Sequence, residues 1–184
     1  MSRNCLNKIW VVDLEATCVD KEHGEKFPEG QESEIIEIGI AELDVKTGEI
    51  ARTFDFIVKP TKSKISKYCT ELTTLTQEQV DQGVTFEKAV KEMRRIGMKS
   101  RIWASYGEYD KKMFKQQCEL RGVEYPFNEQ HLNVKTLFCI KNKIGRGIGT
   151  HKAVEMLKIP FEGTPHRGID DAKMTAKILA SVFK

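Results

Sequence analysis

The sequence contains no apolar run that approaches the length of a membrane-spanning helix, about 18 residues. Residues 1–8 also lack the apolar segment of a signal peptide. The cysteines are scattered and odd in number, and no two form a Cys-x-x-Cys pair; they are Cys5, Cys18, Cys69, Cys118 and Cys139. We therefore expect no membrane association and free thiols in a reducing compartment, the cytoplasm, with neither a disulfide framework nor a zinc ribbon.

No internal repeat, low-complexity tract or linker interrupts the chain. Its 184 residues, 40% of them hydrophobic and 31% charged, have the composition of a globular domain, so residues 1–184 are predicted to form a single domain. The formal net charge is only +3, which is compatible with a polyanionic partner but does not demonstrate one.

A strand is predicted near the start of the chain, where apolar residues 9–12 are followed by Asp13 and Glu15. Side chains alternate along a strand, and both faces of this one begin apolar, which is typical of a central strand covered on both sides. Open α/β sheets bind ligands at the C-terminal ends of such strands. Buried carboxylates need a partner such as a divalent cation, although an isolated Asp-x-Glu is more often a strand edge in contact with solvent.

The remaining pattern predicts a mixed sheet with flanking helices, in one α/β or α+β domain. Turn residues 46–49 predict a hairpin between two further strands, and a fourth strand follows; the three are residues 34–45, 50–58 and 101–106. N-cap residues and apolar spacing predict short helices after Thr76 and at 149–157, and longer ones at 85–98, 108–121 and 168–183. Residues 132–140 fit either a strand or a helix.

Two further acids lie at helix starts on the apolar face. Helical spacing places Asp110 in phase with apolar residues, whereas Glu108 shares its face with lysines. In the same way, Asp171 is in phase with apolar residues of the last helix and Asp170 mainly with lysines. An acid in a first turn commonly does no more than complement the helix dipole, but that does not explain why both acids lie on the apolar phase.

Among the histidines, His166 precedes one of these acids closely, in a turn that leads into the helix of Asp171. A lone histidine in a loop is more often a surface residue than a catalytic one. His23, His131 and His151 have no comparable neighbours, and we expect them to be structural or surface residues.

The ordered set of Asp13-x-Glu15, Asp110 after a strand, and His166 with four residues before Asp171 resembles the DEDDh branch of the DEDD exonuclease superfamily. The segments VVDLEATC, ELTTLTQEQV and GTPHRGIDDA are most similar to the exoribonucleases that trim the 3′ ends of histone mRNA and small RNAs, and to their small bacterial relatives. The similarity runs from about residue 8 to the C-terminus.

This resemblance implies a ribonuclease H-like fold, with a mixed five-stranded sheet, an antiparallel second strand and flanking helices. It implies 3′-to-5′ hydrolysis of single-stranded RNA or DNA ends, RNA preferred, with release of nucleoside 5′-monophosphates. Two divalent ions, Mg²⁺ or Mn²⁺, would be held by carboxylates, which such ions prefer; the implied ligands are Asp13, Glu15, Asp110 and Asp171. His166 would be the general base that takes a proton from the attacking water.

The resemblance also implies contacts with the terminal nucleotide. The backbone of Ala16 and Thr17, with the Thr17 side chain, would meet its 3′ end, and Leu72 would wedge against the last base. Tyr68 and Tyr109 are similar in position to aromatic residues that sandwich that base, and such stacking tolerates any base. Ordinary half-buried packing explains two tyrosines equally well.

Three other features receive no assigned role. A run of lysines could line the path of a nucleic-acid strand, but such a run is usually a solvated face; it comprises Lys59, Lys62, Lys64 and Lys67. Residues 141–149 are glycine-rich yet lack the Gly-Lys-Ser/Thr ending of a phosphate loop, so no nucleotide role is predicted for them. No role can be derived for the polar loop of residues 19–33.

Two functions of different classes remain. The first is a metal-dependent 3′-to-5′ exonuclease, and the second is a non-catalytic nucleic-acid-binding or assembly protein that retains the exonuclease fold. The complete set of acids with His166 favours the enzyme, because a scaffold has no need of an acidic cluster that faces a phosphate backbone.

Overall fold

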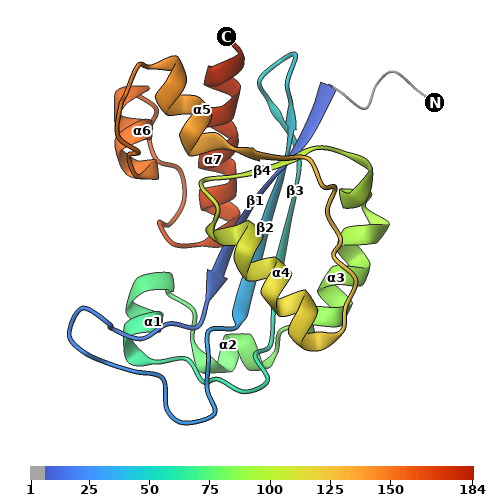
Figure 1. Ribbon diagram of the computed structural model, residues 1–184, viewed down its shortest axis with the longest axis vertical. Coiled ribbons are helices and arrows are strands. Elements are labelled where there is room, and N and C mark those ends of the chain that lie inside the picture. The colour runs from blue at the N-terminus through green and yellow to red at the C-terminus, as the bar shows by residue number, and fades with distance from the viewer. Residues whose placement is uncertain (1–6) are drawn as a thin grey trace.

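A five-stranded mixed sheet runs through the middle of the protein, as the computed structural model of residues 7–184 shows (Figure 1). The strands are β1 Lys8–Ala16, β2 Ile35–Asp44, β3 Ile50–Ile57, β4 Trp103–Ser105 and β5 His131–Asn133. They lie in the order β3-β2-β1-β4-β5. β2 is antiparallel to β1 and β3, whereas β4 is parallel to β1 and to β5. This confirms the predicted mixed sheet with an antiparallel second strand.

Strand β1 is central and covered on both faces, as its apolar pattern predicts. Trp10 and Val12 lie in one hydrophobic core, and Ile9 and Val11 lie in the core on the opposite face. None of these side chains is more than 5% exposed. Asp13 and Glu15 therefore follow directly after a segment that is buried between the two cores.

Helices cover both faces of the sheet (Figure 1). The Trp10 core is completed by α3 (Phe86–Arg95) and α4 (Tyr109–Arg121). The Ile9 core is completed by α5 (Val134–Lys141), α6 (Thr150–Met156) and α7 (Gly168–Phe183). Two short helices lie beyond the end of the sheet at which β1 finishes; they are α1 (Lys67–Thr73) and α2 (Gln77–Asp81).

The structure refines several of the predicted elements. The helix expected to reach residue 98 ends at Arg95, because Gly97 adopts a left-handed conformation with φ of 90°. Residues 132–140 contain both alternatives, since β5 ends at Asn133 and the Asn133 side chain caps α5. Helix α1 was not predicted; its N-cap is Ser66. The capping box that begins with Thr76 forms both of its hydrogen bonds.

Within residues 7–184, no helix has the length and apolar character needed to cross a membrane. The cysteines in this range carry free thiols, as predicted; they are Cys18, Cys69, Cys118 and Cys139. Cys5 lies outside the described residues.

Candidate active site

Acidic side chains that are distant in the sequence meet at the C-terminal end of β1. Asp13 and Glu15 lie on β1, Asp110 lies in the first turn of α4, and Asp171 lies in the first turn of α7. Together with His166 they line one cavity of about 380 Å³. The structure therefore brings together all of the residues expected to form the reacting centre.

Short contacts tie these side chains together. The backbone N–H of Leu14 donates a hydrogen bond of 3.1 Å to Asp110 Oδ1, which joins α4 to β1. Ligand atoms of Glu15, His166 and Asp171 all lie within 4.8 Å of one another. Asp171 Oδ2 is buried and has no hydrogen-bond partner among the described residues. A buried carboxylate oxygen without a partner is costly, so a cation in the cavity would stabilise it.

The neighbouring acids lie outside this cavity, as helical phase predicts. Asp110 is 5% exposed, whereas Glu108 is on the surface. The Asp170 carboxylate does not line the cavity. It accepts a hydrogen bond from the backbone N–H of Thr164 and forms an ion pair with Lys173.

Burial and mutual repulsion disfavour the ionised form of the clustered acids. Burial, followed by the charges of Asp110 and Glu15, holds the pKa of Asp13 well above its usual range. Burial is also the main cause that raises the pKa of Glu15 to about 8 and that of Asp110 to about 6. It raises the pKa of Asp171 as well, against the opposing effect of a backbone hydrogen bond from His166. Positive charge in the cavity would favour the ionised carboxylates.

The turn before α7 holds His166 in an uncommon backbone conformation. Its φ of 59° lies in the left-handed region, which residues other than glycine rarely adopt. The next residue, Arg167, pairs twice with Glu37 of β2, with Nε–Oε2 at 3.0 Å and Nη2–Oε1 at 3.3 Å. Glu37 is fully buried and lies opposite Glu15 in the β1–β2 ladder. Arg167 thus anchors the turn of His166 beside the acids.

The donor set fits hard divalent cations. Mg²⁺ and Mn²⁺ prefer carboxylate oxygens and water to thiolates. The cavity offers carboxylates from β1, α4 and α7, and no cysteine lines it. The unpaired Asp171 oxygen and the raised pKa of the acids are both consistent with a place for positive charge. The site is therefore a candidate metal centre, and His166 lines the same cavity.

A second cavity, of about 440 Å³, adjoins the first, and Tyr109 lines both. Tyr68 and Leu72 of α1 line it as well, with Thr17 just after β1. Aromatic and apolar walls of this kind suit the stacking of a base. The residues expected to contact the terminal base thus surround one space beside the acids.

The loop of residues 19–33 forms part of the wall of this second cavity. Its lining residues include Lys21, Phe27 and Ser33. The Ser33 hydroxyl donates to the carbonyl oxygen of Thr17 at 3.0 Å, which holds the loop against the end of β1. A segment without a predicted role therefore belongs to the site.

Two of the expected substrate contacts are largely engaged within the fold. Thr17 is 1% exposed, and its hydroxyl accepts the backbone N–H of Glu34 at 2.9 Å and donates to the Glu32 carbonyl at 3.2 Å. Ala16 is buried, and its carbonyl oxygen lies 3.7 Å from Cys69 Sγ. Thr17 nevertheless reaches the wall of the second cavity.

Several residues expected to be structural or solvated are so. Most of the lysine run forms surface ion pairs; these lysines are Lys59, Lys62 and Lys67. Lys64 is exposed, and none of the run lines either cavity. His23 is exposed and pairs with Asp20, whereas the side chain of His131 is only 2% exposed.

Sequence reasoning missed His151, a titratable residue that lines this cavity. It was expected to lie apart from the acids, yet it lines their cavity together with Tyr106, Gly149 and Thr150. The glycine-rich segment 141–149 thus ends at the cavity. Local sequence carries no signal for this placement, because His151 reaches the acids only through the packing of α6 against α7.

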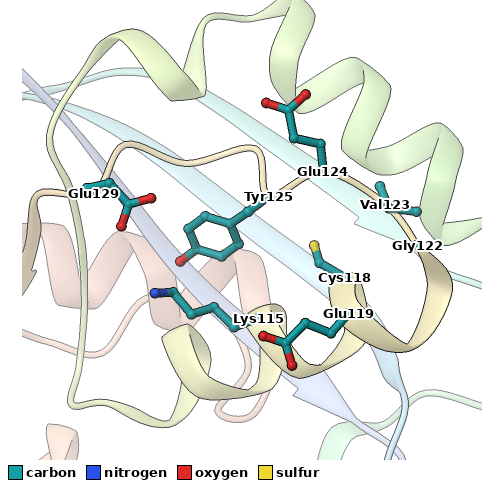
Figure 2. A pocket seen from close by; sticks show the side chains of 8 residues that line it. All are labelled: Lys115, Cys118, Glu119, Gly122, Val123, Glu124, Tyr125 and Glu129. Carbon is teal, nitrogen blue, oxygen red and sulfur yellow. The ribbon is translucent and has the colours of Figure 1, made fainter.

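A larger cavity, of about 550 Å³, lies between the C-terminal half of α4 and the segment that follows it (Figure 2). Its charged lining consists of Lys115 and glutamates, one of which, Glu124, already pairs with Arg94 and Lys99. It shares no lining residue with the cavity of the acids. Size alone therefore does not mark the reacting centre.

Comparison with known proteins agrees with the geometry. The chain matches the exonuclease family RNase T over residues 10–179. It is 32% identical to human 3′-5′ exoribonuclease 1 over 187 residues, which cover 96% of this chain and 52% of that protein. It is 30% identical to the probable 3′-5′ exonuclease KapD of Bacillus subtilis, with 96% of this chain and 84% of that protein covered. The chain thus spans about half the length of the human relative.

A solved structure confirms the fold class. The nuclease domain of 3′hExo, a DEDDh family member bound to rAMP, matches with a TM-score of 0.83 and 30% identity. The match covers 98% of this chain and 93% of that chain. The mixed sheet and its helices are therefore the ribonuclease H-like exonuclease fold that was predicted.

Proposed function

The chain belongs to the exonuclease family RNase T, in its DEDDh branch, and on that premise we propose that it removes nucleotides from single-stranded 3′ ends. RNA is the preferred substrate, and the products are nucleoside 5′-monophosphates. Similarity to an exoribonuclease and to a nuclease domain bound to rAMP supports the preference for RNA. Residues 1–184 act as a single domain, and the free thiols suit the cytoplasm.

One observation carries the proposal: the buried Asp110 of α4 and the partly buried acids of β1 and α7 share a cavity with His166. Buried like charges cost stability, so their clustering calls for a chemical use. Hydrolysis of a phosphodiester supplies that use, because negative charge develops in its transition state and must be neutralised. A protein that only bound nucleic acid would gain nothing from carboxylates facing the phosphates.

The proposed ligands of two divalent ions, Mg²⁺ or Mn²⁺, are Asp13, Glu15, Asp110 and Asp171. Bound there, the ions would neutralise charge on the phosphate and lower the pKa of a water molecule. The Leu14 N–H fixes the Asp110 carboxylate for this role.

His166 is the proposed general base. One of its imidazole nitrogens lies within 4.8 Å of carboxylate oxygens of Glu15 and Asp171. As the water oxygen attacks phosphorus, the imidazole nitrogen takes the water proton and the bond to the leaving 3′ oxygen breaks. Solvent then protonates that oxygen.

The second cavity is proposed to hold the terminal base. Tyr68 and Tyr109 would stack on it, and Leu72 would separate it from the next base. The terminal sugar would then meet the chain near Ala16 and Thr17. Stacking tolerates any base, which suits an enzyme that trims successive nucleotides.

The test is digestion of matched RNA and DNA oligonucleotides labelled at the 5′ end, with Mg²⁺, Mn²⁺ or a chelator. We expect stepwise shortening from the 3′ end with either metal, faster on RNA, and none with the chelator. Folded protein that binds the oligonucleotides but leaves them intact under both metals would instead support the non-catalytic alternative.

Two variants separate the proposed roles. Asp13→Ala is expected to abolish turnover while the protein stays folded, and retained activity would refute its assignment as a metal ligand. His166→Ala is expected to lower kcat far more than it weakens binding. A defect confined to binding would contradict the role of general base.

A further inference from the structure

The cavity of the acids extends past His166 to the first turn of α6, where His151 forms part of the wall. The His151 ring stacks on Phe161, with centroids 5.4 Å apart and planes inclined by 20°. Its centroid lies 6.5 Å from that of His166. His151 is exposed, so its ring nitrogens are accessible to a ligand in the cavity.

The fold holds this wall in place. The Tyr106 hydroxyl donates to the carbonyl oxygen of Ile148 at 2.9 Å, which ties the segment before α6 to the end of β4. Ala153 and Val154 of α6 are buried in the core that α7 completes. The backbone beside His151 is also open, because a Cβ added at Gly149 would meet nothing within 4 Å.

The two cavities meet at Tyr109, and the acids line the first of them. Tyr109 lines both, but Tyr68 and Leu72 line only the second, whereas His151 and Tyr106 line only the first. If the terminal base occupies the second cavity, the bond to be cleaved lies at the acids. The strand then leaves along the first cavity, toward His151.

Resting on the proposed exonuclease function, we propose that His151 binds the substrate one nucleotide upstream of the cleaved bond. Its imidazole donates an N–H hydrogen bond to the second phosphodiester from the 3′ end. Phe161 holds the ring in the orientation this bond requires. His151 is thus a substrate-binding residue, distinct in role from the proton acceptor His166.

The test compares an RNA oligonucleotide with one that carries a neutral methylphosphonate at the second linkage from its 3′ end. The first cleavage of each is measured with the wild type and with His151→Phe, which can keep the stack on Phe161 but lacks the N–H donor. Lys152→Ala is the matched control, since it removes a cation from the same helix outside the cavity. Thermal unfolding confirms that all variants are folded.

We expect the methylphosphonate to lower kcat/KM of the wild type about tenfold, mainly through KM, as loss of a hydrogen bond to a charged group does. His151→Phe should lower kcat/KM on the unmodified RNA by a similar factor and be insensitive to the modification. Lys152→Ala should behave as the wild type on both substrates.

Two results would overturn the assignment. In the first, His151→Phe remains as sensitive to the methylphosphonate as the wild type, and its lower activity comes from kcat. His151 would then act in the chemical step beside His166 and not in binding the upstream phosphate. Alternatively, His151→Phe could cleave the unmodified RNA as well as the wild type does. A wild type that shortens no oligonucleotide at all would refute the proposed function itself, which is a different outcome.

Discussion

Gly39 of β2 and Gly168 of α7 are in direct backbone contact. A Cβ built on Gly39 would lie 2.0 Å from the carbonyl carbon of Gly168. Gly39 also lies opposite Asp13 in the β1–β2 ladder, and Gly168 opens the helix that carries Asp171. The two glycines therefore set how closely the first and last acids of the cluster approach each other.

Gly39→Ala is predicted to displace the first turn of α7. The methyl group has no space because its nearest neighbours are backbone atoms of Gly168 and Ile169. We expect activity to fall by more than tenfold and the free energy of unfolding to fall by about 2 kcal/mol, a typical cost of overpacking. Oligonucleotide digestion and denaturant titration measure the two effects. Gly145→Ala is the control, since a Cβ there meets nothing within 4 Å; an equal loss in both variants would contradict this reading of the contact.

Asp13→Asn is predicted to stabilise the metal-free protein. Burial and neighbouring carboxylates raise the pKa of Asp13, so the folded state binds more protons than the unfolded state and loses stability as the pH rises above about 4, where the unfolded state releases its proton. Removing the charge should raise the unfolding midpoint at pH 8 by about 2–4 °C, which corresponds to about 1 kcal/mol.

The same variant should lose the stabilisation that Mn²⁺ gives the wild type. Scanning calorimetry with and without Mn²⁺ measures both effects. Asp81→Asn serves as the control, because Asp81 is half-exposed and pairs with Lys59 at the surface. A lower midpoint for Asp13→Asn without metal would show that the cluster is not under electrostatic stress.

Glu37→Gln is predicted to lower both stability and activity. Glu37 is fully buried and holds Arg167, the residue after His166. Breaking a buried ion pair typically costs about 3–5 kcal/mol, and about 2 kcal/mol is expected here because Arg167 is partly exposed. The released turn should lower kcat about tenfold, as measured in steady-state digestion.

Glu42→Gln is the matched control for this prediction. Glu42 is another buried glutamate of β2, paired with Arg52 at 2.7 Å near the opposite end of the strand. Its variant should lose stability but keep kcat. If both variants kept kcat, the Arg167 anchor would have no bearing on catalysis.

Stability is predicted to depend on His131 below neutral pH. Burial lowers the pKa of His131 to about 4, whereas the unfolded state takes up the proton near pH 6.5. The free energy of unfolding should therefore decrease as the pH falls from about 6.5 to 4, by about 3 kcal/mol at most. Denaturant titrations of the wild type and His131→Gln across this range isolate the contribution. A variant with the same pH dependence as the wild type would contradict it.

Periodicity in the sequence predicted the parts of this fold that depend on local pattern. The alternation in β1 placed Trp10 and Ile9 in opposite cores, and helical phase separated Asp110 from Glu108. Strand alternation and helical spacing, together with the resemblance of the motifs, were sufficient to predict which acids lie together.

Features that depend on contacts between distant segments could not be predicted in this way. His151 enters the cavity through helix packing, and Gly39 is required only because α7 docks on it. Helix α1 escaped prediction because its Ser66 cap precedes a mostly polar segment. The Thr17 hydroxyl is committed to backbone atoms of residues 32 and 34, which no spacing reveals.

The most direct measurement is X-ray diffraction at the manganese edge from crystals soaked in Mn²⁺ with a nucleoside 5′-monophosphate. The account predicts two anomalous peaks among the carboxylates of β1, α4 and α7, and none at that place in crystals of Asp13→Ala. Well-ordered wild-type crystals with no peak there, or with manganese only at other carboxylates, would contradict it.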